Sequence, residues 1–137
     1  MSAEENRKLV IDFCRLLSER KLDEMFALMA EVSNWSAVGK RETFAYGGPK
    51  DKPGSIAMIT AFLQHFREFR FEVKSSTGED DRVAIEASSR GVGPSGKVYE
   101  NQYLLMFRCA GGKIVDIQEY FDQITVLEYE KAESNAH

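Results

Sequence analysis

The fold of this chain is decided by the stretch from Lys97 to Gln123, which reads KVYENQYLLMFRCAGGKIVDIQEYFDQ. Apolar and polar residues alternate along it with a period of two, which is typical of β-strands. Gly111 and Gly112 divide the stretch into two predicted strands, 97–109 and 112–123. Two strands joined by so short a turn form an antiparallel hairpin. The stretch therefore predicts the last hairpin of an antiparallel sheet.

Working back along the chain, the same alternation predicts strands over 70–77 and 82–91. Turn-forming residues separate them, at 78–81 and again at 93–96. Consecutive strands with short turns favour an antiparallel meander. A further short strand is predicted over 34–38.

The first part of the chain has helical spacing. Apolar residues recur every three or four positions over 4–19, a second short helix is predicted after Lys21, and a third over 56–69 with Ser55 as its N-cap. Helices followed by strands in one small chain predict an α+β fold with the helices on one face of the sheet. The polar segment 39–53 is predicted to be a long loop, as in many lids and binding loops.

Composition narrows the class of protein. The 137 residues suit a single domain, 1–137, with an ordered core over about 5–128, and the polar residues Glu130 to His137 are expected to fray. The net charge of −4 and the lack of a basic run argue against nucleic-acid binding. We expect no membrane helix and no signal peptide, and hence a cytoplasmic protein.

Three motifs that resemble catalytic or metal-binding signatures do not meet the requirements of those sites. Two cysteines and two histidines cannot supply a zinc site. The G-x-G-x-x-G pattern over 91–96 precedes a predicted strand where a nucleotide site needs a helix, so it indicates a hairpin turn. His65 has no nucleophile motif near it, and we interpret it as a residue at the rim of the core.

The C-terminal pattern resembles a known family. Asn101-x-Tyr103-x-x-x-Phe107, then Gly112-Lys113-Ile114, then Glu119-Tyr120-Phe121-Asp122 resembles the final hairpin of the SnoaL-like branch of the nuclear transport factor 2-like superfamily. The resemblance implies a curved, cone-like antiparallel sheet wrapped around three helices and enclosing an apolar pocket. It also implies a small apolar ligand, no metal or other cofactor, and a homodimer.

The resemblance assigns candidate roles residue by residue. The Asp-Arg-Asp set of the family's epoxide hydrolases falls on Glu119, Glu86 and Ser88, so that mechanism is not expected. In the polyketide cyclases one acidic residue acts as acid and base, and its best counterpart is Glu119. Asp122 is the second candidate, although alternation places it on the opposite face, as a turn partner.

Alternation suggests that Glu86 and Glu119 point into the same aromatic space. Two carboxyl groups in a poorly solvated site resist double ionisation, so one would stay protonated near neutral pH and supply an acid beside a base. Asn101 and Tyr103 could donate hydrogen bonds to an enolate-like oxygen. Alternatively, Arg90 pairs with one carboxylate and the site is only structural. The candidate binding residues are Trp35, Phe62, His65, Phe66, Ser88, Arg90, Asn101, Tyr103 and Phe121.

Three functions remain open at this point. The first is a cofactor-free isomerase, cyclase or dehydratase that acts on a polyketide, terpenoid or steroid type of molecule. The second is a module that binds such a molecule without changing it. The third is a dimerisation domain of the same fold.

Overall fold

The computed structural model describes residues 1–136, which form helices and strands in the order expected for an α+β chain. In chain order they are α1 (Ala3–Ser18), α2 (Leu22–Phe26), β1 (Met29–Ala37), α3 (Lys52–His65), β2 (Glu68–Glu79), β3 (Arg82–Val92), β4 (Val98–Ala110), β5 (Lys113–Phe121) and α4 (Gln123–Asn135).

The five strands form one curved sheet in the order β1-β5-β4-β3-β2. Strands β2 to β5 pair antiparallel, as the meander pattern predicts. Strand β1 instead lies parallel to β5, with Trp35 opposite Ile117 and Ala37 opposite Glu119. Alternation within a strand does not reveal its direction relative to a neighbour that is distant in sequence, so this parallel pair was not predicted.

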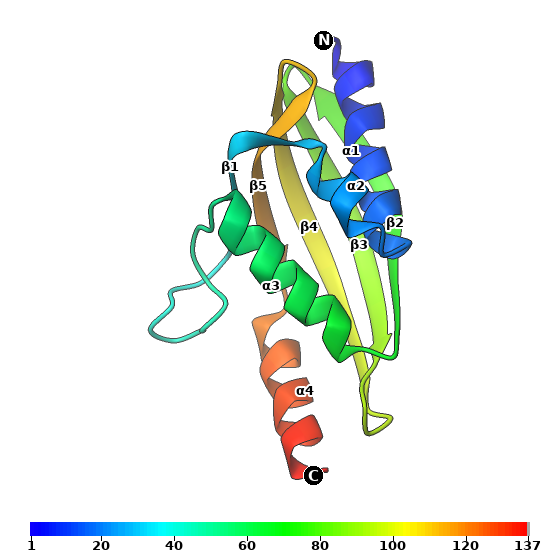
Figure 1. The fold of residues 1–137 in the computed structure, drawn as a ribbon, viewed down its shortest axis with the longest axis vertical. Helices are drawn as coiled ribbons and strands as arrows, with labels where there is room; N and C mark the ends of the chain where they lie inside the picture. Colours follow the sequence, from blue (N-terminus) through cyan, green and yellow to red (C-terminus); the bar gives the residue numbers. More distant parts are fainter. Residues whose placement is uncertain (137) are drawn as a thin grey trace.

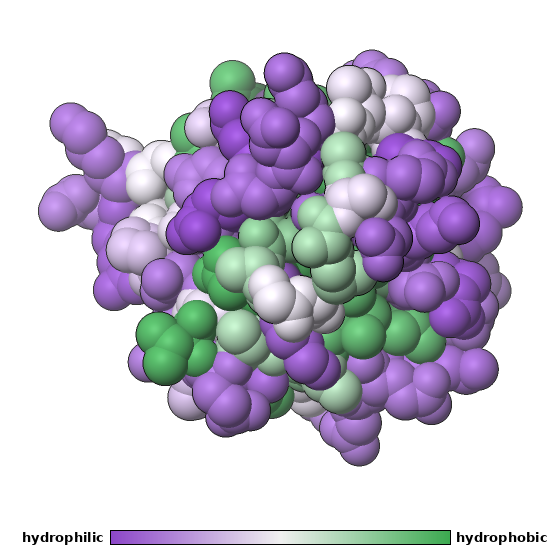
Figure 2. Space-filling model, turned by 90° about the horizontal axis from the view of Figure 1, so that it is seen from above, coloured by the Kyte–Doolittle hydropathy of each residue, from purple (hydrophilic) through white to green (hydrophobic). Residues whose placement is uncertain are grey.

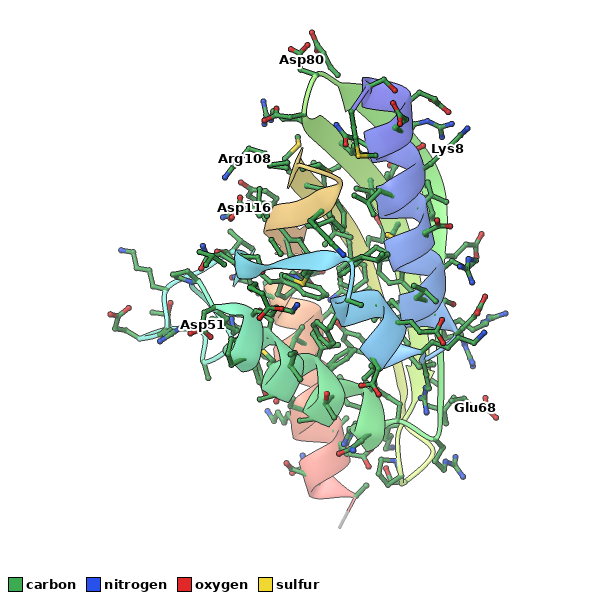
Figure 3. The ribbon with its side chains drawn as sticks, turned by 45° about the horizontal axis from the view of Figure 1, so that its top comes forward. Lys8, Asp51, Glu68, Asp80, Arg108 and Asp116 are labelled. Carbon is green, nitrogen blue, oxygen red and sulfur yellow. The ribbon has the colours of Figure 1, made fainter. Side chains whose placement is uncertain are left out.

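Helices α1, α2 and α3 cover one face of the sheet, and α4 continues downward from the end of β5 beside α3 (Figure 1). The core lies between these layers and contains Val10, Phe13, Ile85 and Phe107, all nearly inaccessible to solvent. At the end where the N-terminus lies, apolar residues gather in the middle of the surface inside a hydrophilic rim (Figure 2). The labelled charged side chains, such as Lys8 and Glu68, point away from the body of the molecule (Figure 3).

Local signals explain where the helices start. Ser2 and Glu5 form a reciprocal capping box at the start of α1. Helix α3 begins four residues before the predicted start, because Asp51 rather than Ser55 is the N-cap and accepts a 2.9 Å bond from the Gly54 amide. Pro53 lies in the first turn, where the N–H group that proline lacks would have no partner within the helix. The helix ends at His65 rather than at residue 69, since Phe66 already has an extended backbone.

The predicted fraying of the C-terminal segment is wrong for residues 130–136. Helix α4 extends to Asn135, and its Glu133 is buried, only 6% exposed. Asp122 is the N-cap, accepting from the amides of Ile124 and Thr125, so strand β5 ends at Phe121. Of the segment expected to fray, His137 lies outside the described residues.

The loop between β1 and α3 is folded back along β1. Gly48 pairs with Ala37 and Asp51 with Asn34 in isolated bridges. The Arg41 guanidinium donates to the carbonyls of Gly47 and Pro49, at 3.1 and 2.7 Å. Two aromatic residues of this loop, Phe44 and Tyr46, line the cavity that is described in the next subsection.

Candidate active site

A cavity of about 700 Å³ lies between the inner face of the sheet and helices α1, α3 and α4. Its walls are mainly aromatic and aliphatic side chains, with few polar groups, as is typical of sites for small organic molecules. The candidate residues that line it are Trp35, Phe62, His65, Phe66, Tyr103, Glu119 and Phe121.

Glu119 brings a carboxyl group into this apolar cavity from β5. The indole Nε1 of Trp35, on the neighbouring strand, donates a 2.8 Å hydrogen bond to Glu119 Oε1. Burial raises the pKa of Glu119 to about 7, while the Trp35 hydrogen bond and the charge of Lys50 lower it. Near neutral pH both the acid and its conjugate base are therefore populated.

A chain of hydroxyl groups runs along the inner face of β4. The hydroxyls of Tyr103 and Ser89 lie 2.8 Å apart, and those of Tyr103 and Tyr99 lie 3.3 Å apart. Both tyrosines line the cavity. Burial is the main cause that raises the pKa of Tyr103 well above its ordinary value, so this phenol stays protonated and can donate.

Asn101 holds one end of this chain through the Tyr99 hydroxyl. Its Oδ1 accepts from the backbone amides of Gln102 and Asp122, at 2.8 and 3.2 Å, and this fixes which side of the amide is Nδ2. Nδ2 donates to the Asp122 carbonyl and to the Tyr99 hydroxyl, at 3.0 and 2.7 Å. Since the Tyr99 oxygen already accepts a hydrogen bond, its proton is available to Tyr103. In the Tyr99–Tyr103 contact either hydroxyl can be the donor.

The structure does not bring Glu86 to this site. Glu86 is exposed on the outer face of β3 and accepts a 3.1 Å hydrogen bond from the Ser75 hydroxyl. The expected pairing of Glu86 with Glu119 is therefore corrected. Its neighbours Val83, Ile85 and Ala87 fill the core instead, because burying their apolar surface is more favourable than burying charge.

Three other candidates also lie outside the cavity. Ser88 and Arg90 share the outer face of β3 with Glu86, opposite Gln102 and Glu100 of β4. Arg90 therefore does not face Glu119. Asn101 is buried and does not line this cavity; its hydrogen bonds position Tyr99 and the end of β5.

Several cavity residues are not among the residues predicted from sequence. Tyr129, Glu130 and Glu133 reach the cavity from α4, whose helical periodicity is too weak to predict the helix. Tyr99 was placed on the correct face of β4 but was not singled out. Its position two residues before Asn101 is the signal that could have found it.

Two of the three glycines of the G-x-G-x-x-G pattern, Gly91 and Gly93, serve packing at the hairpin between β3 and β4. A Cβ on Gly91 would lie 2.7 Å from the Phe66 ring, and one on Gly93 would collide with the Tyr129 hydroxyl. The interpretation of this pattern as a hairpin turn is confirmed, with β3 ending at Val92 and β4 starting at Val98. Both glycines make room for aromatic side chains of the cavity wall.

Within the described residues, 1–136, no group of three His, Cys, Asp or Glu side chains is placed to hold a metal ion. Nor does any helix there have the length and apolar character needed to cross a membrane. Cys14 and Cys109 are buried free thiols.

Comparison with known proteins identifies a family and a shared fold. The SnoaL-like domain family model matches residues 10–117. No curated protein matches the chain. Among solved structures, a nuclear transport factor 2-like protein of unknown function from Burkholderia pseudomallei is similar, with 20% identity, 94% and 98% of the two chains covered and a TM-score of 0.80.

Two further solved structures share the fold. PrhC from Penicillium brasilianum is 17% identical, with 99% of this chain and 93% of that chain covered and a TM-score of 0.84. IdmH from Streptomyces antibioticus, described as a putative polyketide cyclase, is 20% identical, with 92% and 98% covered and a TM-score of 0.76. At such identities the likeness concerns the fold.

Proposed function

The chain belongs to the SnoaL-like family of the nuclear transport factor 2-like superfamily, and we propose that it is a cofactor-free enzyme of the isomerase or cyclase type. Its substrate would be a small, mostly apolar, oxygenated molecule of polyketide, terpenoid or steroid type. The observation that carries the proposal is the Glu119 carboxyl group inside an aromatic cavity, hydrogen-bonded to Trp35 and with a pKa of about 7.

Glu119 acts first as the general base. The carboxylate takes a proton from a carbon atom next to a substrate carbonyl, and the electron pair of that C–H bond moves toward the carbonyl oxygen. The resulting enolate is stabilised by a hydrogen bond from the Tyr103 hydroxyl, which the Ser89 and Tyr99 hydroxyls hold in place. In an isomerisation the enolate is conjugated with a C=C bond, and protonated Glu119 returns the proton to the far carbon of that bond, so the double bond moves. In a cyclisation the enolate carbon attacks a second carbonyl and closes a ring, and protonated Glu119 gives its proton to the resulting alkoxide.

The environment of Glu119 suits both its role as a base, which takes the proton, and its role as an acid, which returns it. A general acid or base works best when its pKa lies near the working pH. Burial among apolar side chains moves the carboxyl group there, and the Trp35 indole holds Oε1 in place. IdmH, similar in fold, is described as a putative polyketide cyclase, which supports this reaction class. The homodimer implied by the resemblance stays a prediction.

Deuterium exchange tests the proposal without knowledge of the natural substrate. We expect the protein to accelerate exchange of the α-protons of 2-tetralone in D₂O, followed by NMR, and to lose this activity in Glu119→Gln. Glu86→Gln is the matched control, since it changes a glutamate on the outer face. If 2-tetralone quenches Trp35 fluorescence but exchanges no faster with wild type than with Glu119→Gln, the cavity binds without catalysing.

A further inference from the structure

The segment that precedes α3 pairs with the outer edge of β1 and extends the sheet by a short stretch. Gly48 and Ala37 form an antiparallel bridge. Two residues further along the segment, the Trp35 amide donates to the Lys50 carbonyl at 2.9 Å, and the Lys50 amide donates to the Trp35 carbonyl at 3.2 Å. Residues directly opposite each other in antiparallel strands project their side chains to the same face. Since Trp35 lines the cavity, the side chain of Lys50 starts from the cavity side of the sheet.

Glu119 lies in the neighbouring row of the same sheet. Ala37 is opposite Glu119 on one side, through the parallel pairing of β1 with β5, and opposite Gly48 on the other. The Lys50 side chain turns toward this row, because its Nζ donates to the Gly48 carbonyl at 3.2 Å. The ammonium group and the Glu119 carboxyl group therefore lie toward opposite ends of one row, to which Ala37 adds only a methyl group and Gly48 no side chain.

Hydrogen bonds to the backbone fix the position of this ammonium group. Lys50 Nζ donates to the carbonyls of Tyr46 and Gly48, at 2.7 and 3.2 Å, and the Arg41 guanidinium donates to the carbonyls of residues 47 and 49. The two cations thus alternate along the carbonyls of residues 46–49. Lys50 is half-buried, and carbonyl oxygens partly replace the water that a buried charge loses. The charge is therefore held at a fixed place beside the cavity.

The charges of Lys50 and Glu119 act on each other. Burial raises the pKa of Glu119, and the Trp35 hydrogen bond and then the charge of Lys50 lower it. Burial, followed by the charge of Arg41, lowers the pKa of Lys50, and the charge of Glu119 raises it. The ordinary pKa of lysine, about 10.4, lies far above neutral pH, so the ammonium group stays charged there. Lys50 thus favours the carboxylate form of Glu119, which is the form that takes a proton.

Most other titratable groups of the cavity wall are uncharged near neutral pH. Burial raises the pKa of Cys14 on α1 and of the tyrosines in the wall, which are Tyr46, Tyr99, Tyr103 and Tyr129. Three groups that carry or can carry a charge line the outer end of the cavity, where α3 and α4 flank it: His65, Glu130 and Glu133. Of the charged groups in residues 1–136, Lys50 is the one whose charge shifts the pKa of Glu119.

We propose that Lys50 is a positioning residue for Glu119: its ammonium group, held by the carbonyls of Tyr46 and Gly48, favours the ionised carboxylate and so the step in which Glu119 takes a proton. Lys50 is not among the described residues that line the cavity, so it acts on a substrate only through Glu119. This inference rests on the proposed function for what the carboxylate does. The interaction between the two charges can be measured without turnover.

Replacement of Lys50 tests the proposal through the titration of Glu119 itself. Lys50→Met keeps an unbranched side chain and removes the charge, so the Glu119 carboxyl signal in NMR should titrate about 0.5 pH unit higher or more. Lys50→Arg restores a cation and should titrate near the wild type. Arg41→Met is the matched control: it removes the other cation that holds the same loop segment, and the pKa of Glu119 should stay unchanged.

An unchanged pKa of Glu119 in Lys50→Met would overturn the proposal, as would an equal rise in Lys50→Met and Arg41→Met, because Lys50 would then only hold the loop. A second measurement leaves Lys50 and its loop intact. In Glu119→Gln the pKa of the Lys50 ammonium group, followed by NMR of its side-chain Cε, should fall by a similar amount, since the coupling between two charges is reciprocal. No fall there would contradict the proposal even if Lys50→Met did not fold.

The exchange of 2-tetralone adds a readout of function. In Lys50→Met the rise of the exchange rate with pH should move to higher pH by the same amount as the pKa of Glu119, with the rate at high pH close to wild type. A rise that stays at the wild-type pH while the carboxyl titration moves would overturn the role of Lys50 in the reaction. If the wild type exchanges no faster than Glu119→Gln at any pH, the proposed function fails, and the NMR titrations still decide whether Lys50 acts on Glu119.

Discussion

Trp35 and Glu119 meet across the one parallel strand pair of the described sheet, with the indole Nε1 donating to the Glu119 carboxylate at 2.8 Å. The parallel register places Ala37 opposite Glu119, so a side chain two residues earlier on β1 reaches diagonally to the carboxyl group. Trp35 is itself 6% exposed. This hydrogen bond holds the Glu119 carboxyl group in place within the cavity, and burial keeps its pKa above the ordinary glutamate value.

The first prediction concerns the titration of Glu119. Because burial raises its pKa to about 7, its side-chain carboxyl signal should titrate far above the ordinary glutamate range. Trp35→Phe should raise this pKa further, since the variant removes a hydrogen bond that favours the charged form. Carboxyl NMR measures both, with Glu119→Gln identifying the signal. Titration near 4.5 in the wild type would contradict a desolvated carboxyl group.

The second prediction links this pKa to folding. A carboxyl group with a raised pKa in the folded state stabilises the protein fully below pH 4.5, and this contribution is lost as the pH rises through about 7. Relative to Glu119→Gln, the wild type should lose up to about 3 kcal/mol of unfolding free energy between pH 4.5 and 8.5. Urea unfolding across this range measures the difference. Glu86→Gln, an exposed glutamate, should show no comparable divergence from wild type.

The third prediction concerns Asn101, which organises the end of the sheet. Asn101→Leu keeps the volume but leaves the amide and carbonyl of Asp122 and the Tyr99 hydroxyl without their partner. We expect a loss of about 2–4 kcal/mol in unfolding free energy, because buried polar groups without partners are costly. Gln102→Leu, at the exposed neighbour, is the control. Similar losses in both variants would show that Asn101 has no special role.

The fourth prediction concerns helix α4. Truncation after Glu128 removes Tyr129, Glu130 and Glu133 and opens the outer end of the cavity. The melting temperature should fall, and binding of an apolar dye should increase, because aromatic side chains become exposed. Truncation after Ser134 is the control and should change neither. If truncation after Glu128 left the melting temperature unchanged, α4 would add nothing to the stability of the fold.

Glu119 lies on the face that alternation predicts, whereas Glu86 does not. On β5, Ile117 shares a face with Glu119, so the apolar side of the strand is easily recognised. On β3 the more apolar set contains Val83 and Ile85, and Glu86 belongs to the other set, which carries charged residues. Burial of the apolar set therefore turns Glu86 to the outer face of the sheet.

The sequence by itself determined the α+β class, the order of the first three helices and five strands, the family resemblance and the candidate acid Glu119. These features follow from local periodicity and turn residues, which are encoded over a few neighbouring positions. Tertiary structure alone decided the parallel pairing of β1 with β5, the folding of α4 against the cavity, and the meeting of Trp35 with Glu119. These depend on contacts between residues far apart in the chain, so the pattern within any one segment cannot specify them.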